Sequence, residues 1–222
     1  MSEAAPKKRM TKAEREQAQR ERCEKLHAFD AQVGESHGIF CGVDEAGRGP
    51  LCGPVCCAAV ILDPERPIEG VDDSKKLTEK KREQLYDIIM ENAVAASVVM
   101  IGPEEIDRVN IRNATMEGMV QAVQGLSFEP AFALIDGDFV PNGLLTPAAS
   151  CVKGDATSAS IAAASILAKV TRDRYMEQLD REFPQYQLAK HKGYGTKLHY
   201  EMIEKYGIQP FYRRSFLKKL GY

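Results

Sequence analysis

The chain has 222 residues, of which 44% are hydrophobic and 28% are charged, and its formal net charge is −2. This length fits one domain with a substantial core, and the composition is typical of a soluble globular protein. The charge excludes a protein that is basic throughout, so any nucleic-acid binding has to use local basic patches.

The sequence predicts a cytoplasmic protein without a membrane segment. No apolar run approaches the roughly 20 residues that span a bilayer. Near the N-terminus, Pro6-Lys7-Lys8-Arg9 lacks the apolar stretch of a secretory signal. The six cysteines form no C-x-x-C pair and no zinc spacing with histidine, so we expect reduced cysteines that pack as small hydrophobic residues.

Residues 1–37 are polar and differ from the rest of the chain. They contain a helix-favouring charged run from Thr11 to Leu26 that offers few apolar positions for a core. We interpret 1–37 as a charged N-terminal extension, helical in part, and 38–222 as the main domain. The extension is either a solubilising segment or an arm that guides nucleic acid, and its mixed charge favours the first.

From Ile39 onward, apolar β-branched segments alternate with segments of helical spacing. Strands are predicted over residues 39–44, 55–62, 93–101, 131–135 and 144–152. Helices are predicted to begin at Thr78, Pro103, Asn110, Asp155 and Thr196. Pro184 should end the long fourth helix, and Gly207 should close the last one. This order predicts an α/β fold with a mixed central sheet flanked by helices and a C-terminal helical portion.

Two adjacent carboxylates and a glycine-flanked arginine follow the first predicted strand. Mg²⁺ and Mn²⁺ prefer carboxylate oxygens such as those of Asp44 and Glu45. Arg48, between Gly47 and Gly49, can present its guanidinium and nearby backbone N–H groups to a phosphate or a sugar. Adjacent side chains of a regular strand point to opposite faces, so the two carboxylates can share a cation only where the strand ends. The alternative is a turn with solvated charges.

Two more carboxylates occupy positions from which they can join this pair. Asp136 directly follows the fourth predicted strand, and it emerges beside Asp44 if the first and fourth strands are parallel neighbours. Asp155 suits a helix N-cap, although a capping carboxylate keeps lone pairs for a metal. Carboxylates that bridge two cations suit phosphodiester hydrolysis, in which one ion activates water and the other stabilises the leaving oxygen. The sequence contains no P-loop, H-E-x-x-H or G-x-S-x-G motif that suggests other chemistry.

Five motifs follow one another in a characteristic order, at residues 42–50, 72–77, 135–137, 153–155 and 191–196. In these motifs the chain resembles bacterial ribonuclease HII, from roughly residue 38 to its end. The resemblance implies a ribonuclease H-like catalytic domain at 38–222 that uses Mn²⁺ or Mg²⁺, two ions per site during catalysis. The implied substrates are RNA/DNA hybrids and duplex DNA with embedded ribonucleotides. The implied cut lies 5′ of the ribonucleotide and leaves 3′-hydroxyl and 5′-phosphate ends.

The resemblance also implies a role for each matching residue. The acidic set that holds the cations comprises Asp44, Glu45, Asp136 and Asp155, the last of which positions the second ion or the water. The residues that match the family's substrate contacts are Gly47, Arg48 and Gly49 for the ribose 2′-hydroxyl, Ser74 and Lys75 for a phosphate, and Tyr194 for the sugar after the ribonucleotide. This assignment suits the chemistry, because the 2′-hydroxyl is the group that separates RNA from DNA.

Some assignments stay open at this level. Lys169 and Arg172 either contact the duplex backbone or form a solvated helix face. His191 and His199 are left out of the catalytic set, because a metal-activated water needs no histidine base. The C-terminal segment from Phe211 to Tyr222 either docks a partner such as a replication clamp or covers the core.

Two other functions compete with this prediction. A non-catalytic module that binds hybrids has no evident use for four carboxylates, which would repel a polyanion. Ribonuclease HIII-like activity is disfavoured because residues 1–37 leave no room for that enzyme's larger N-terminal domain. We expect a monomer.

Overall fold

The computed structural model describes residues 11–222, so Pro6 to Arg9 and the first part of the predicted extension lie outside the described residues. The helices and strands, in chain order, are α1 (Lys12–His37), β1 (Phe40–Ala46), β2 (Val55–Ile61), α2 (Glu79–Asn92), β3 (Ala95–Ile101), α3 (Pro103–Val109), α4 (Ile111–Gln124), β4 (Phe132–Asp136), β5 (Ala148–Cys151), α5 (Ala159–Glu182), α6 (Leu188–His191) and α7 (Lys197–Tyr206).

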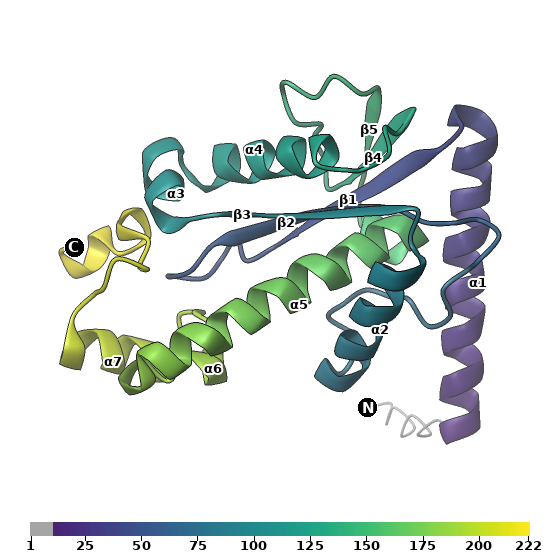
Figure 1. Cartoon of the computed structure of the whole chain (residues 1–222). Coiled ribbons are helices and arrows are strands. Elements are labelled where there is room, and N and C mark those ends of the chain that lie inside the picture. The colour runs from purple at the N-terminus through teal and green to yellow at the C-terminus, as the bar shows by residue number, and fades with distance from the viewer. Residues whose placement is uncertain (1–10) are drawn as a thin grey trace, which may run out of the picture.

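The strands form one mixed sheet in the order β3-β2-β1-β4-β5 (Figure 1). β1 lies at its centre, antiparallel to β2 and parallel to β4. In the β1–β4 pair, Val43 lies opposite Ile135, so the residues that follow them emerge at the same edge of the sheet. The first and fourth strands are thus parallel neighbours, which is the condition under which Asp136 emerges beside Asp44.

Helices cover both faces of the sheet (Figure 1). On β2, Cys56, Ala58 and Val60 pack against α5, whereas Cys57, Ala59 and Ile61 belong to the core on the side of α4. This alternation is what a strand buried on both faces requires. All six cysteines are free, and five of them are buried, as the sequence predicts.

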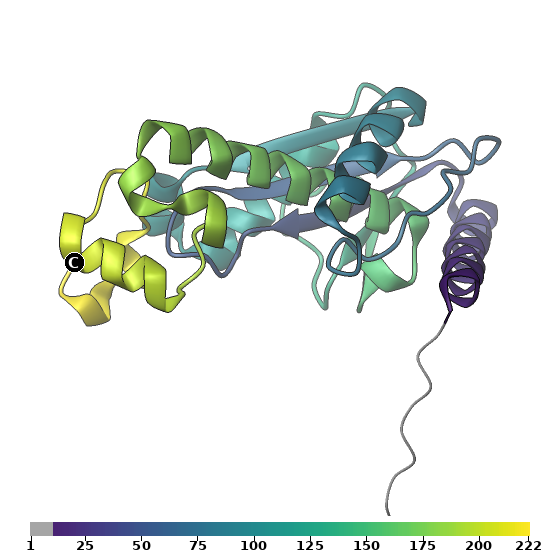
Figure 2. The ribbon, with the colours of Figure 1, turned by 90° about the horizontal axis from the view of Figure 1, so that it is seen from below.

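The N-terminal helix and the C-terminal segment lie at opposite ends of the sheet (Figures 1 and 2). At the C-terminal end, α6, α7 and the residues after them enclose a third core that includes Phe211, Tyr212 and Leu217. The first part of the segment from Phe211 to Tyr222 therefore covers the core. None of the helices in residues 11–222 is long and apolar enough to cross a membrane.

Several elements differ from their predicted form. The first strand, predicted over 39–44, runs from Phe40 to Ala46, so Asp44 and Glu45 lie within β1 and not at its end. The N-terminal helix continues past Leu26 to His37, because Cys23 and Leu26 are buried against the domain and support it. The strand predicted over 144–152 is shortened to Ala148–Cys151. The prediction that Asp155 caps the long helix is wrong. Asp155 lies in a 3₁₀ turn (Gly154–Ala156), and the Ser158 hydroxyl caps α5 by accepting the N–H of Ile161.

Gly42 determines how closely α5 approaches the sheet. A Cβ atom at this position would lie 2.2 Å from the carbonyl carbon of Ser160. We expect Gly42→Ala to lower the free energy of unfolding by about 3 kcal/mol, because strand and helix backbones must separate. The melting temperature should fall by about 6–12 °C. Gly34→Ala in α1 is the control: it meets no atom within 4 Å. It should be neutral or stabilising, and equal melting temperatures for the two variants would contradict the close contact.

Candidate active site

Two of the predicted carboxylates lie side by side at the edge where β1 and β4 end. Asp44 and Asp136 follow the paired residues Val43 and Ile135, which point toward α4, so both carboxylates lie on the α5 side of the sheet. Asp44 is buried, and its Oδ1 accepts the N–H of Glu45 at 2.7 Å. Oδ1 of Asp136 accepts the N–H of Gly154 at 2.6 Å, which ties the end of β4 to the turn that contains Asp155.

The other two carboxylates approach this edge, and each is paired with a cation. Glu45 continues β1 and lies 3.4 Å from a guanidinium nitrogen of Arg48. Asp155 is buried, and Lys75 Nζ donates to its Oδ2 at 3.1 Å. Lys75 is itself 77% exposed, so its charge lies between the acidic set and solvent.

Burial and mutual repulsion dominate the electrostatics of this edge. Burial raises the pKa of Asp44 well above its usual range, and the charges of Glu45 and Asp136 raise it further. Burial also raises the pKa of Glu45, against the opposing effect of Arg48. The pKa of Asp136 is raised by burial and then by the charge of Asp155. The edge is therefore a concentration of negative charge that a bound cation would stabilise.

The oxygen atoms of these residues suit a hard divalent cation, although the side chains do not converge on one point. Within residues 11–222, no three His, Cys, Asp or Glu side chains converge closely enough to hold a metal as they stand. The physical reason is that Asp44 and Glu45 are successive residues within β1 and point to opposite faces of the sheet. In addition, Glu45 is paired with Arg48 and Asp155 with Lys75. All the donors are oxygens, as Mg²⁺ and Mn²⁺ prefer. Both pairing cations are partly exposed and can move aside.

The loop after β1 is held by a buried arginine that the sequence analysis missed. Arg213 is fully buried, and its guanidinium donates to the carbonyl oxygens of Gly47, Arg48, Pro50 and Gly53 at 2.7–3.1 Å. Burial lowers its pKa to about 10, so it remains charged at neutral pH. The available sequence signal is the position of Arg213 directly after the aromatic pair Phe211-Tyr212, which the structure buries together with it.

Arg172 is the second buried arginine, and it corrects a prediction. Helical spacing suggested that it contacts the duplex or lies on a solvated face. Instead it is 1% exposed, and it donates to the carbonyl oxygens of Cys52, Pro54 and Lys192. It also lies directly beneath Gly47, where a Cβ atom would be 2.1 Å from Nε. Gly47 has a φ of +94°, which suits glycine. Lys169, also considered for the duplex, donates to Asp173 at 2.6 Å.

Tyr194 lies next to this loop from the other side. Its ring is 45% exposed, and a Cβ atom on Gly49 would lie 3.8 Å from its Cε1. The N–H of Leu51 donates to the carbonyl of Gly193 at 2.8 Å, which joins the two segments. The structure thus brings Gly47, Arg48, Gly49 and Tyr194 together directly after the carboxylates of β1.

Ser74 and Lys75 differ in what they can offer a ligand. The Ser74 side chain is buried, and its hydroxyl lies 2.9 Å from that of Ser165 on α5. Lys75 reaches the acidic set from an exposed position. Of the two, Lys75 is the residue whose side chain faces solvent at the site.

The two histidines left out of the catalytic set are buried beneath Tyr194. Their rings stack 4.1 Å apart, and Nδ1 of His199 lies 3.0 Å from the carbonyl oxygen of Tyr194. Burial lowers the pKa of His199 to about 4, and the charge of His191 acts in the same direction. These histidines support the Tyr194 loop from below.

The lowered pKa of His199 predicts that the protein loses stability in acid at the histidines that support the Tyr194 loop. The unfolded chain binds the proton near pH 6.5 and the folded chain only near pH 4, so stability is lost as pH falls between these values. The loss should be on the order of 3 kcal/mol at the lower limit. We expect the free energy of unfolding of the wild type to fall by this amount relative to His199→Asn between pH 7 and 4. Parallel pH profiles for the two proteins would contradict the assignment.

The mixed sheet, with carboxylates near the carboxyl ends of its two parallel central strands beside a glycine-rich loop and an exposed tyrosine, agrees with the nuclease of the ribonuclease H type that the sequence motifs imply. A family model described as Ribonuclease HII matches residues 41–219. The chain therefore belongs to the ribonuclease HII family and is an endoribonuclease.

Individual relatives agree with this membership. Ribonuclease HII of Aliivibrio fischeri (strain MJ11) is 56% identical over 182 residues, covering 82% of this chain and 87% of the relative. A structure of the PCNA:RNase HII complex from Archaeoglobus fulgidus matches with a TM-score of 0.67 at 28% identity, covering 79% of this chain and 93% of that one. A structure of Bst-RNase HIII in complex with Mn²⁺ shares the fold, with a TM-score of 0.61 at 22% identity, covering 76% of this chain and 63% of that one.

Proposed function

We propose that this chain hydrolyses the RNA strand of RNA/DNA hybrids and cuts duplex DNA on the 5′ side of embedded ribonucleotides, leaving 3′-hydroxyl and 5′-phosphate ends. One observation carries the proposal. The carboxylates Asp44 and Glu45 run directly into a loop that contacts Tyr194, so groups suited to cutting lie beside groups suited to selecting a ribose.

The loop is suited to a ribose hydroxyl because its backbone is pinned from within. Arg213 occupies the carbonyl oxygens of Gly47 and Arg48, so the N–H groups of the loop are the backbone groups left for a 2′-hydroxyl. Gly49 leaves the Tyr194 face open to the neighbouring sugar. A deoxyribose fits against an aromatic ring at close range, whereas a 2′-hydroxyl at that position would disturb the contact.

Asp44, Glu45 and Asp136 would hold a divalent cation, Mn²⁺ or Mg²⁺, and Asp155 would position a second one. Bound there, the cations supply Lewis acidity that activates water and stabilises the leaving oxygen. Lys75 and Arg48 keep the metal-free acidic set partly neutralised, and they are close enough to turn toward a phosphate when substrate enters. Neutralising the carboxylates and contacting a phosphate thus both use the charges of Lys75 and Arg48 at this edge of the sheet.

The remaining predictions concern the oligomeric state, the cellular compartment and the protein partner of the chain. A monomer in the cytoplasm remains the expectation for this chain. Contact with a replication clamp would have to use the last residues, because Phe211 to Leu217 is largely taken up by the core. Leu220 and Tyr222 are 48% and 44% exposed and are the apolar side chains left for such a contact.

The proposal is tested with a labelled RNA/DNA hybrid and a DNA duplex of the same sequence, each incubated with Mg²⁺, Mn²⁺ or a chelator. The RNA strand should be cut only with metal, and the DNA duplex should stay intact. Cleavage in chelator would contradict the metal assignment. A hybrid that is bound but uncut at saturating Mn²⁺ would favour the non-catalytic binding module.

Tyr194 should affect the cleavage of substrates with a single ribonucleotide more than it affects the affinity for the duplex. We expect Tyr194→Ala to lower kcat/KM at a single embedded ribonucleotide by about tenfold, since aromatic contacts to nucleotides contribute 1–3 kcal/mol. Cleavage within long hybrids and binding to the duplex should change less. Tyr206→Ala is the matched control, because Tyr206 is 41% exposed and lies at the far end of α7. Equal losses on both substrates would exclude the selective role.

A further inference from the structure

Helix α1 lies outside the residues that the family model matches, yet it is firmly attached to the catalytic domain. The Asp30 carboxylate accepts three hydrogen bonds, from Ser158 Oγ at 2.6 Å and from Ser160 N and Oγ at 2.8 and 2.7 Å. Cys23 and Leu26 are buried in the core shared with α5. The helix is therefore held in a definite position next to the turn that contains Asp155.

A cavity of about 300 Å³ separates one flank of α1 from that turn. Arg22, Lys25 and Phe29 of α1 line it together with Asp72, Lys76 and Thr157. Lys76 follows Lys75, and Thr157 lies two residues after Asp155, so the cavity adjoins the Lys75–Asp155 ion pair. The flank of α1 thus continues the surface of the catalytic edge.

The charge of this cavity is positive. Its one carboxylate, Asp72, is buried and already paired with Arg22 at 3.0 Å and with Lys76 at 3.5 Å. Both cations remain 49% exposed. Lys25 is exposed and makes no ion pair within residues 11–222. Lys76 also lies 3.8 Å from the carboxylate of Asp73. Three cations against these two carboxylates leave a net positive charge for an anion, and Lys25 carries it without an ion-pair partner within the described residues.

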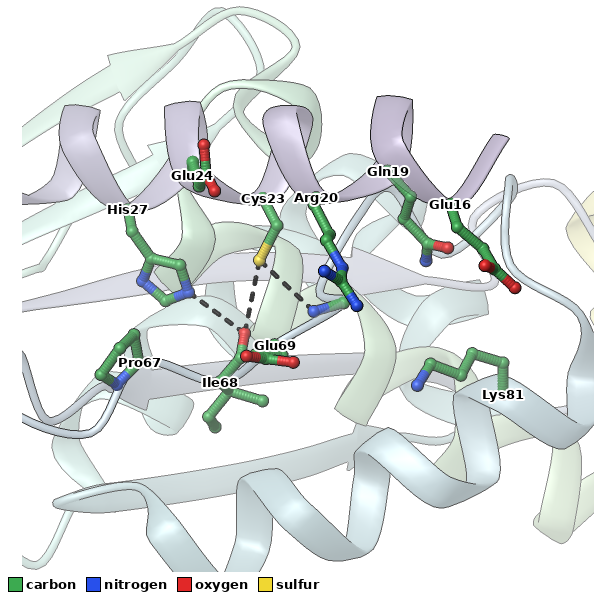
Figure 3. A pocket seen from close by; sticks show the side chains of 11 residues that line it. Glu16, Gln19, Arg20, Cys23, Glu24, His27, Pro67, Ile68, Glu69 and Lys81 are labelled. Atoms are coloured by element: carbon green, nitrogen blue, oxygen red, sulfur yellow. Dashed lines mark hydrogen bonds between the residues drawn. The ribbon is translucent and has the colours of Figure 1, made fainter. Parts of the chain in front are cut away.

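Basic residues occur on more than one side of α1, but Arg22 and Lys25 are the ones that line this cavity. Glu21, one turn before Lys25, is the acidic neighbour on this side. Arg15, Arg22 and Lys25 are spaced by seven and three residues, which puts them on the same strip as Phe29. We call this strip, with Lys76, the α1 basic strip. The other flank faces a second cavity in which the cations Arg20 and Lys81 are accompanied by the carboxylates of Glu16, Glu24 and Glu69 (Figure 3). Mixed charge there offers a polyanion no net attraction.

We infer that the α1 basic strip binds the phosphodiester backbone of the substrate duplex beyond the catalytic carboxylates. The inference rests on the proposed function for its ligand. α1 and the C-terminal segment lie at opposite ends of the sheet (Figures 1 and 2), so a duplex that passes Tyr194 and the carboxylates continues toward α1. A row of cations along that course contributes affinity that depends on salt and is independent of base sequence.

Lys25→Glu tests the strip, and Arg20→Glu is the matched control. Both residues are exposed on the same helix, both changes alter the charge equally, and only Lys25 belongs to the strip. Fluorescence anisotropy with a labelled hybrid, in chelator, gives a Kd that does not depend on cleavage. Thermal melting of each variant checks that the fold is intact.

Lys25→Glu should raise the Kd by roughly 3- to 10-fold, and Lys25→Ala should reduce the salt dependence of log Kd by about one unit. Arg20→Glu should leave both quantities near the wild type. Equal Kd values for the two charge reversals, or no binding of hybrid by the wild type, would overturn the inference. Tight binding that requires Lys25 without any cleavage would instead contradict the proposed function alone.

Discussion

Asp44→Asn is expected to lower the cleavage rate by at least about a thousandfold, because a metal ligand worth about 4 kcal/mol in the transition state is lost. The same change should raise the free energy of unfolding at neutral pH in the absence of metal. Burial and the charges of Glu45 and Asp136 raise the pKa of Asp44, so its ionised form is costly in the fold. Loss of activity together with a gain in stability would mark a functional carboxylate.

Asp138→Asn provides the control for this result. Asp138 is exposed, two residues beyond Asp136, and it undergoes the same change of charge. It should retain the activity and stability of the wild type. The measurements are initial cleavage rates with Mn²⁺ and chemical unfolding in chelator. Near-normal cleavage by Asp44→Asn, or its unfolding at lower denaturant, would contradict the assignment.

Arg213→Met should have the largest effect on both stability and selection. It removes four hydrogen bonds from a buried guanidinium and leaves the carbonyl oxygens of Gly47, Arg48, Pro50 and Gly53 without that donor. Buried carbonyls without partners are costly, so we expect a loss of about 4 kcal/mol and a fall in melting temperature of about 8–16 °C. Because the loop loses its internal support, kcat/KM on single-ribonucleotide substrates should fall further than on long hybrids.

Arg213→Lys separates charge from geometry. Lysine keeps the positive charge but lacks the planar fork that reaches several carbonyls at once, so selection should be restored only in part. Arg214→Met is the matched control, because Arg214 is the next residue in the chain and its side chain is exposed. Melting curves and cleavage of the two substrates are the measurements. If Arg213→Met and Arg214→Met behave alike, the loop does not depend on the buried guanidinium.

The sequence predicted those parts of the site whose causes are local. Apolar periodicity located the strands, and the carboxylates were found because they come at the predicted ends of two of them, although β1 continues to Ala46. The parallel pairing that brings Asp44 beside Asp136 was only a condition of the sequence analysis, and the structure supplies it. The proximity of Tyr194 to Gly49 was implied only by the resemblance, since 145 residues of chain separate motifs that no local pattern connects.

The features that were missed depend on distant backbone groups. Arg172 and Arg213 donate to backbone carbonyl oxygens. Every residue has a backbone carbonyl, so the sequence does not indicate which of them a buried arginine binds. Asp155 and Ser158 are equally good N-caps by type. Ser158 takes that position, and its hydroxyl donates a hydrogen bond to Asp30 in α1, which is distant in the sequence. The same contact attaches a helix whose own composition suggested a loosely held extension.

Mapping the cut in a DNA duplex that carries one labelled ribonucleotide tests the central claim most directly. The account predicts a single cut on the 5′ side of the ribonucleotide in Mn²⁺ or Mg²⁺, with 3′-hydroxyl and 5′-phosphate ends, and no cut in chelator. A cut on the 3′ side, cleavage without metal, or an intact duplex at saturating Mn²⁺ would contradict it.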